Sequence, residues 1–167
     1  MEVSPERMFF MYAFPALAGC SSASEEKIRG LEKLLISGGA PSWDELNELV
    51  PTAIQRKNRV AKGKRLELES VDAVKEYWWV EHNRIINSGE EGYADSPSHA
   101  REACKVSFVE VVGLESDAEK IVYYNKRGDE MRALTYFSDL EVGDFVTLHL
   151  GRVVEKISLE DYREYRE

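Results

Sequence analysis

Cys104 and His149 are the two residues of this chain whose types suit chemistry at one shared place. His149 is one of 3 histidines, and an imidazole can exchange protons or ligate a metal near neutral pH. The thiolate of a cysteine can ligate a soft metal or attack a carbonyl carbon. The residues alone leave a second interpretation open, in which Cys104 is a small buried apolar side chain and His149 a satisfied structural group.

The segment around His149 predicts two strands joined at a glycine. A Gly143-Asp144 turn precedes the first strand, and Gly151 separates it from the second. Residues on a strand alternate between its two faces. This alternation places Val146, Leu148 and Leu150 on one face, and Phe145, Thr147 and His149 on the other.

The other candidate sites have weaker patterns. The paired spacings of structural zinc sites do not occur, although His82, His99 and His149 could be assembled with carboxylates into a catalytic metal site. His82 also fits a half-exposed position near a helix C-terminus. The aromatic run 77–79 fits a core face better than a ligand shelf. Since the sequence has neither a phosphate-binding glycine loop nor a nucleophile elbow, we expect a protein that is not an enzyme.

Charge argues against a nucleic-acid partner. Acidic residues outnumber basic ones by 31 to 22, a net charge of −9, whereas phosphate neutralisation supplies most of the affinity of nucleic-acid binders. One basic cluster lies between residues 56 and 65, and we interpret it as a solvated helix end. Its members are Arg56, Lys57, Arg59, Lys62, Lys64 and Arg65.

Cysteine usage and hydropathy indicate a cytoplasmic protein. The 2 cysteines, Cys20 and Cys104, lie far apart in dissimilar contexts, which is no disulfide framework and suits a reducing compartment. No apolar run is long enough for a transmembrane helix. The N-terminal segment has acidic residues where a secretory signal would have basic ones.

The hydrophobic pattern has a helical period before residue 100, which predicts an all-helical domain over residues 1–88. Helices are expected to begin after Ser4, Ser24, Ser42 and Ser70, each of which suits an N-cap. Ser42 and Glu45 have capping-box spacing. We expect the first helix to end at Pro15, the helix after Ser42 to be interrupted at Pro51, and the last helix to close at residues 87–89.

Residues 89–102 are small and polar and predict a linker or exposed loop, and residues 103–167 have the period of strands. Five short strands, the first beginning at Cys104, are followed by a helix over residues 159–166. So many short strands usually close into a barrel, because closure removes exposed edges. The predicted fold is therefore of the α+β class: a helical N-terminal domain, then a small five-stranded OB-like β-barrel with a short C-terminal helix.

Residues 143–157 resemble the end of the HypC/HupF family of hydrogenase-assembly chaperones, which carry a pattern like Val-Gly-Asp-Tyr-Val-Leu-Val-His-x-Gly-x-Ala-Ile-x-Lys-Ile. His149 matches the histidine of that pattern. The run from Cys104 to Val112 is similar to the family's opening Cys-x-x-x-Pro-x-x-Val-Val, with Phe108 in place of the proline and the cysteine inside the chain. The resemblance covers only the barrel, about residues 103–160.

The resemblance implies an accessory protein of nickel–iron hydrogenase maturation. Cys104 and His149 would then bind a partner or an iron fragment, with Cys104 as the metal ligand. The implied partner is a HypD-like protein or a hydrogenase large subunit, and the implied cargo is a transient iron-cyanide-carbonyl fragment rather than a stably bound cofactor.

Two alternatives to this function stay open. The barrel could be an interaction module that kept its fold without the metal-fragment site. It could also bind single-stranded nucleic acid through aromatic stacking platforms, for which the candidates are Tyr123, Tyr124, Tyr136 and Phe137. Neither the partner nor the oligomeric state follows from the sequence.

Overall fold

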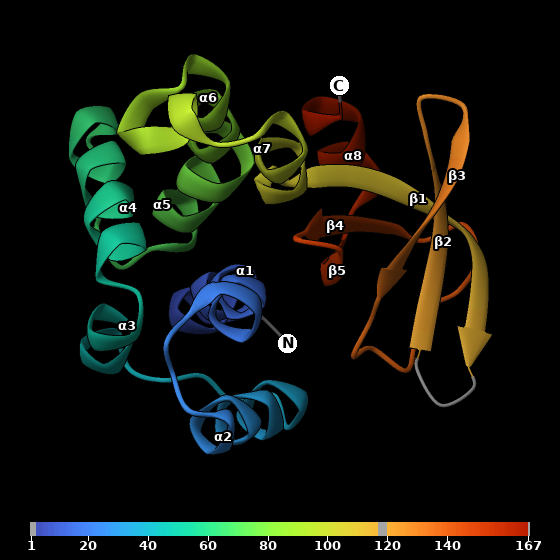
Figure 1. Ribbon diagram of the computed structural model, residues 1–167, viewed down its shortest axis with the longest axis horizontal. Coiled ribbons are helices and arrows are strands. Elements are labelled where there is room, and N and C mark those ends of the chain that lie inside the picture. The colour runs from blue at the N-terminus through green and yellow to red at the C-terminus, as the bar shows by residue number, and fades with distance from the viewer. Residues whose placement is uncertain (1–2, 117–119, 167) are drawn as a thin grey trace. The chain divides into compact units, whose positions relative to one another are not determined.

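The computed structural model describes residues 3–116 and 120–166 (Figure 1). The chain divides into two compact units, Met1–Arg84 and Ile85–Glu167. The first unit is helical, and the second contains a β-barrel. This order of elements confirms the predicted α+β class, with a helical part before the barrel and a short helix after it.

Helices fill the first unit, and a π-helical segment, η1, lies near its end. The elements are α1 (Pro5–Cys20), α2 (Glu25–Ile36), α3 (Trp43–Leu49), α4 (Pro51–Lys64), α5 (Val71–Lys75), η1 (Glu76–Glu81) and α6 (His82–Ser88), the last of which crosses the division between the units.

The predicted N-caps of these helices are confirmed. The side chains of Ser4, Ser24 and Ser70 each accept a hydrogen bond from a backbone N–H in the first turn of the helix that follows. Ser42 and Glu45 form the full capping box. Each cap satisfies an N–H group that has no partner within its own helix, and so fixes where the helix begins.

The prediction that the first helix ends at Pro15 is wrong, because α1 continues through this proline to Cys20. A proline inside a helix removes one backbone hydrogen bond and costs about 3 kcal/mol. Residues on both sides of it are buried, including Phe9, Phe10, Phe14 and Leu17, each at most 4% exposed. Burying one such side chain stabilises by about 1.5–3 kcal/mol, so the packing of α1 outweighs its proline.

The strands of the second unit close into a barrel in the order β1-β2-β3-β5-β4. All neighbours are antiparallel except β3 and β5, which pair in parallel. Its interior is apolar and includes Val109, Val111, Val122, Val146 and Leu148. The strands are β1 (Ser107–Ser116), β2 (Lys120–Lys126), β3 (Asp129–Leu134), β4 (Phe145–His149) and β5 (Arg152–Ile157).

The stretch predicted as a linker, residues 89–102, contains the 3-10 segment η2 (Glu90–Asp95) and most of α7 (Ser98–Cys104). The structure divides the chain earlier, between Arg84 and Ile85. One prediction for this region is wrong: Cys104 is the last residue of α7 and not the first of a strand, and β1 begins at Ser107.

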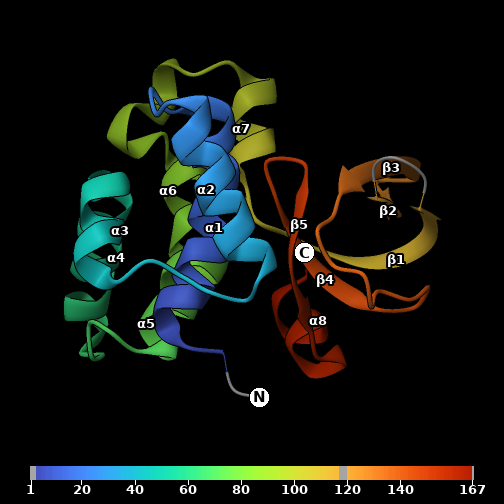
Figure 2. The same cartoon turned by 90° about the horizontal axis from the view of Figure 1, so that it is seen from below.

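A short C-terminal helix, α8 (Leu159–Tyr165), lies against β1 and β4, beside β4 in both views of the molecule (Figures 1 and 2). Its Tyr162 ring stacks on Phe145 at 4.4 Å between centroids, and its Tyr165 ring stacks on Phe108 at 5.8 Å. The helix therefore covers part of the outer face of the barrel. Within the described residues, no helix has the length and apolar character that crossing a membrane requires.

Candidate functional site

His149 is the last residue of β4 and is only 3% exposed. Its strand is buried on both faces: Val146 and Leu148 belong to the barrel core, while Thr147 and His149 are buried on the opposite face. The predicted alternation is thus correct along the strand itself. It fails at Leu150, which has a positive φ of 49° and forms the turn to β5 with Gly151.

Cys104 is half-buried at the C-terminal end of α7. The residue before it, Ala103, accepts a backbone hydrogen bond of 3.1 Å from the N–H of Leu150. Leu150 directly follows His149 in the chain. The fold therefore brings the cysteine and the histidine, 45 positions apart in sequence, each to within one residue of the same hydrogen bond.

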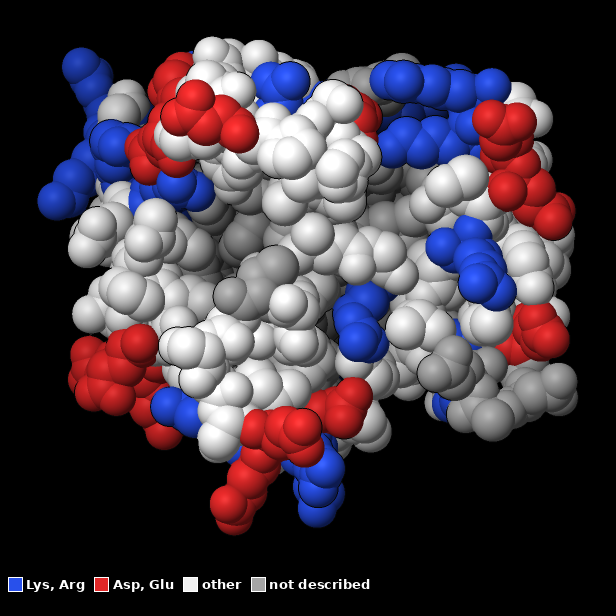
Figure 3. Space-filling view, in the orientation of Figure 1, with Lys and Arg blue, Asp and Glu red and all other residues white. Residues whose placement is uncertain are grey.

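Positive side chains gather where α7 ends. Lys105 forms an ion pair of 2.5 Å with Glu102, and the Lys126 ammonium group donates to the Ser107 hydroxyl at 3.3 Å. The hydrogen bond from Lys105 lowers the pKa of Glu102, and the charges of Lys126 and Arg127 lower it further. Figure 3 shows Lys and Arg side chains gathered at the upper right, where Figure 1 places the tip of the β2–β3 hairpin.

The other distinctive residues of the 143–157 segment have structural roles. Asp144 accepts one hydrogen bond of 2.8 Å from the Glu141 N–H and forms a 2.8 Å ion pair with Lys156. Burial alone would raise the pKa of Asp144, but these two partners outweigh it and lower that pKa. Gly143 and Gly151 have φ values of 96° and 73°, which favour glycine in their turns.

Metal binding by this chain alone has little support from geometry. Over residues 3–116 and 120–166, no three or more His, Cys, Asp or Glu side chains are grouped as metal ligands would be. His99 is exposed on α7, and His82 lies in the first unit. Cys104 and His149 offer at most two donors, so a metal fragment held there would need further ligands from elsewhere.

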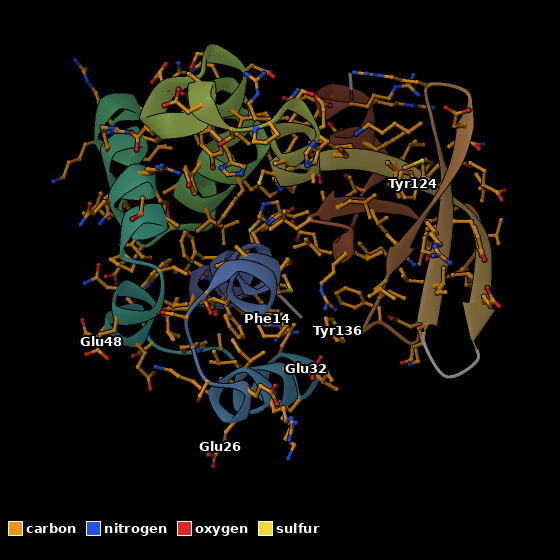
Figure 4. All side chains as sticks on the ribbon, viewed as in Figure 1. Phe14, Glu26, Glu32, Glu48, Tyr124 and Tyr136 are labelled. Atoms are coloured by element: carbon orange, nitrogen blue, oxygen red, sulfur yellow. The ribbon has the colours of Figure 1, made fainter. Side chains whose placement is uncertain are left out.

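The four aromatic residues considered as stacking platforms are not all available. Tyr124, labelled in Figure 4, is 7% exposed and belongs to the barrel core, and Phe137 packs against that core. The Tyr136 hydroxyl accepts a hydrogen bond of 2.5 Å from Arg152. The Tyr123 hydroxyl donates to Glu115 at 2.7 Å. Of the four, Tyr124 is therefore buried, and the hydroxyls of Tyr123 and Tyr136 are held by neighbouring side chains.

A buried lysine in the first unit escaped the sequence analysis. The prediction that Lys57 belongs to a solvated helix end is wrong, because its side chain is 1% exposed. Its ammonium group donates to the carbonyl oxygen of Leu68 and lies 4.0 Å from the ring centroid of Trp43. Burial lowers the pKa of Lys57 to about 8, although the carboxylates of Glu69 and Glu6 oppose this shift. Its position on the apolar side of α4, three residues after Ile54, was the one available signal.

The aromatic run 77–79 forms a core face, as the sequence favoured. Tyr77, Trp78 and Trp79 are 1%, 3% and 4% exposed, and all three lie in the π-helical η1. The i→i+5 bonding of a π-helix turns successive residues through a smaller angle, which helps three neighbours reach one core. His82 packs edge-on against Trp78 at 4.8 Å and is 5% exposed, so its predicted half-exposed position is wrong.

Comparisons of the chain with protein-family models, with curated proteins and with solved structures find no match.

Proposed function

We propose that this chain is a non-enzymatic accessory protein of nickel–iron hydrogenase maturation, acting through its barrel on a HypD-like partner. The observation that carries the proposal is the hydrogen bond between Leu150 and Ala103. This bond joins the residue before Cys104 to the residue after His149, the two positions marked by the HypC/HupF resemblance, and so supports a shared site. Elsewhere in the matching segment, Gly143 and Gly151 have positive φ angles and Asp144 pairs with Lys156.

In this function Cys104 is the group that contacts the partner, or the iron fragment that the partner carries. Cys104 is half-buried at the C-terminal end of α7. His149, buried at the end of β4, acts as a positioning residue. The iron-cyanide-carbonyl fragment is cargo that passes through the site, and its remaining ligands come from the partner.

The test is binding of purified HypD to the full-length chain, measured by titration calorimetry. We expect Cys104→Ala to weaken binding by about tenfold, equivalent to about 1.4 kcal/mol. Cys20→Ala is the matched control, since it removes the other thiol and leaves α7 untouched. We expect this control to bind like the wild type.

Each other outcome selects a different function. Equal binding by wild type and Cys104→Ala would contradict the role of the thiol and favour an interaction module that kept the barrel without the site. No binding of HypD by the wild type would contradict the link to hydrogenase maturation. Salt-sensitive binding of a single-stranded oligonucleotide would favour the nucleic-acid function instead.

A further inference from the structure

Strand β3 has an edge that the barrel leaves largely uncovered. It pairs with β2 at every residue from Asp129 to Leu134, but with β5 only at Leu134, opposite Arg152. Among the described residues, the rest of this edge has no neighbouring strand. In Figure 1 the tip of the β2–β3 hairpin stands away from β4 and β5.

The turn of the hairpin determines which backbone groups point out from this edge. Arg127 and Gly128 have φ values of 54° and 91°, as in a two-residue type I′ turn. Such a turn makes its flanking residues, Lys126 and Asp129, a hydrogen-bonded pair, and pairs then alternate along the ladder. Every second residue of β3 from Glu130 onward therefore directs its N–H and C=O away from β2. The N–H of Leu134 follows this rule, since it donates to Gly151 at 3.0 Å.

Glu130 and Arg132 are thus the residues whose backbone groups face the open edge. Both side chains are exposed, and neither forms an ion pair within the described chain. The charge of Arg132 lowers the pKa of the Tyr123 hydroxyl and that of Glu130 raises it. Residues two positions apart on a strand share a face, so the side chains of Glu130 and Arg132 lie on the same face of the sheet, near Tyr123. Met131 lies between them on the other face and is 45% exposed.

We propose that a second copy of this chain pairs with this edge, β3 against β3, in antiparallel orientation about a two-fold axis at Met131. This register places Glu130 of each copy opposite Arg132 of the other. Both residues direct their backbone groups outward, so each Glu–Arg pair exchanges two N–H···O bonds. Opposite charges face each other twice on one side, and the two methionines meet on the other.

Self-complementarity is the reason for choosing a second copy over a different protein. An isologous interface requires that a surface match itself under two-fold rotation, and the order Glu130-Met131-Arg132 does so in charge, polarity and hydrogen-bond direction. Beyond Leu134 the edge is occupied by β5, which limits the new ladder to the five residues before it. So short a pairing buries little area and gives a weak dimer that forms with rising concentration.

Sedimentation equilibrium of the full-length chain at low salt, over a range of concentrations, measures the dimer directly. We expect the wild type to dimerise reversibly. Arg132→Glu places two carboxylates opposite each other at both pairs, and we expect it to weaken the dimer by about tenfold or more. The double variant Glu130→Arg/Arg132→Glu restores the opposite charges with the same net charge as the wild type, and we expect it to dimerise again.

Arg127→Glu is the matched control, because it makes the same change of charge in the turn, outside the pairing register. We expect it to dimerise like the wild type. Amide hydrogen exchange gives a second measure: the N–H groups of Glu130 and Arg132 gain protection as concentration rises. A wild type that stays monomeric, a dimer indifferent to Arg132→Glu, or a double variant that is not rescued would each overturn the proposal. A failure of HypD binding would leave this result unaffected, since the two tests use different residues.

Discussion

Replacement of the buried Lys57 tests whether burial of its charged form destabilises the first unit. Lys57 is 1% exposed, its amine donates to the Leu68 carbonyl group, and burial lowers its pKa from 10.5 to about 8. In the unfolded chain this lysine has its ordinary pKa. The variant Lys57→Met keeps a side chain of similar length and removes the titrating group.

The sign of the effect follows from proton binding. Between pH 8 and 10.5 the unfolded chain holds a proton on Lys57 that the folded chain has released. The free energy of unfolding therefore rises with pH across this window, and the charged form destabilises the fold below it. The shift of 10.5 − 8 = 2.5 units corresponds to about 3.4 kcal/mol in all, of which about 2 kcal/mol is gained between about pH 7 and about pH 9.5.

Urea unfolding followed by tryptophan fluorescence is the appropriate assay. All 3 tryptophans, Trp43, Trp78 and Trp79, lie in the first unit, so their emission reports the unit that contains Lys57. We expect the wild type to gain about 2 kcal/mol more than Lys57→Met between about pH 7 and about pH 9.5. Lys62→Met is the matched control, since Lys62 is an exposed lysine further along the same helix, and it should follow the wild type.

If the free energy of unfolding changes with pH in the same way for the wild type and Lys57→Met, this reasoning is refuted. That result would mean that the amine keeps an ordinary pKa in the folded chain, and that its contacts with Leu68 and Trp43 compensate its burial in full. If the free energy of unfolding of Lys62→Met rises with pH by a different amount from that of the wild type, the pH dependence belongs to the general charge of α4 and not to the buried lysine.

The remaining predictions concern single contacts. Tyr12→Phe removes the acceptor of the buried 2.6 Å hydrogen bond from the Trp79 indole, and we expect a loss of about 1–3 kcal/mol in tryptophan-detected urea unfolding. Leu150→Asn should stabilise the barrel by about 1 kcal/mol, because asparagine tolerates the φ of 49°; faster exchange of the β4 and β5 amides would contradict this. Because the pKa of Asp144 is lower in the folded chain than in the unfolded chain, its carboxylate stabilises the barrel above the unfolded pKa. This stabilisation is lost as pH falls through the folded pKa. Asp144→Asn, which also breaks the Lys156 ion pair, should therefore lose less barrel amide protection on acidification than the wild type.

Local signals in the sequence were sufficient to predict most elements of this fold. The caps at Ser4, Ser24, Ser42 and Ser70 act within one turn of chain, and so do the positive φ angles at Gly128 and Gly151. Because these caps and turns involve residues only a few positions apart, the local sequence is enough to predict them. The strand periods and their number then favoured closure into a barrel, which the structure has.

The predictions that failed at Pro15 and Lys57 depend on contacts distant in sequence. Pro15 stays inside α1 because the aromatic residues around it pack into the core of the first unit. Lys57 stands among exposed cations in sequence, and only the fold encloses it beside Trp43 and Leu68. His82 is buried although its contact with Trp78 is only four positions away in the sequence, because Trp78 itself packs into the core against Phe9 and Tyr12. Local propensity gives no sign of such burial, because it depends on which surfaces meet.

The candidate site also combines features that the local sequence predicts with features that only the fold decides. The sequence by itself determined the types of its two residues, the strand that holds His149 and the glycine turn that follows. Only the tertiary structure decided that Cys104 ends a helix, and that this helix end meets the turn after His149 through the bond from Leu150 to Ala103. The physical reason is the distance along the chain: the contact between Ala103 and Leu150 joins residues far apart in sequence and is set by barrel closure, whose energy is shared among many side chains.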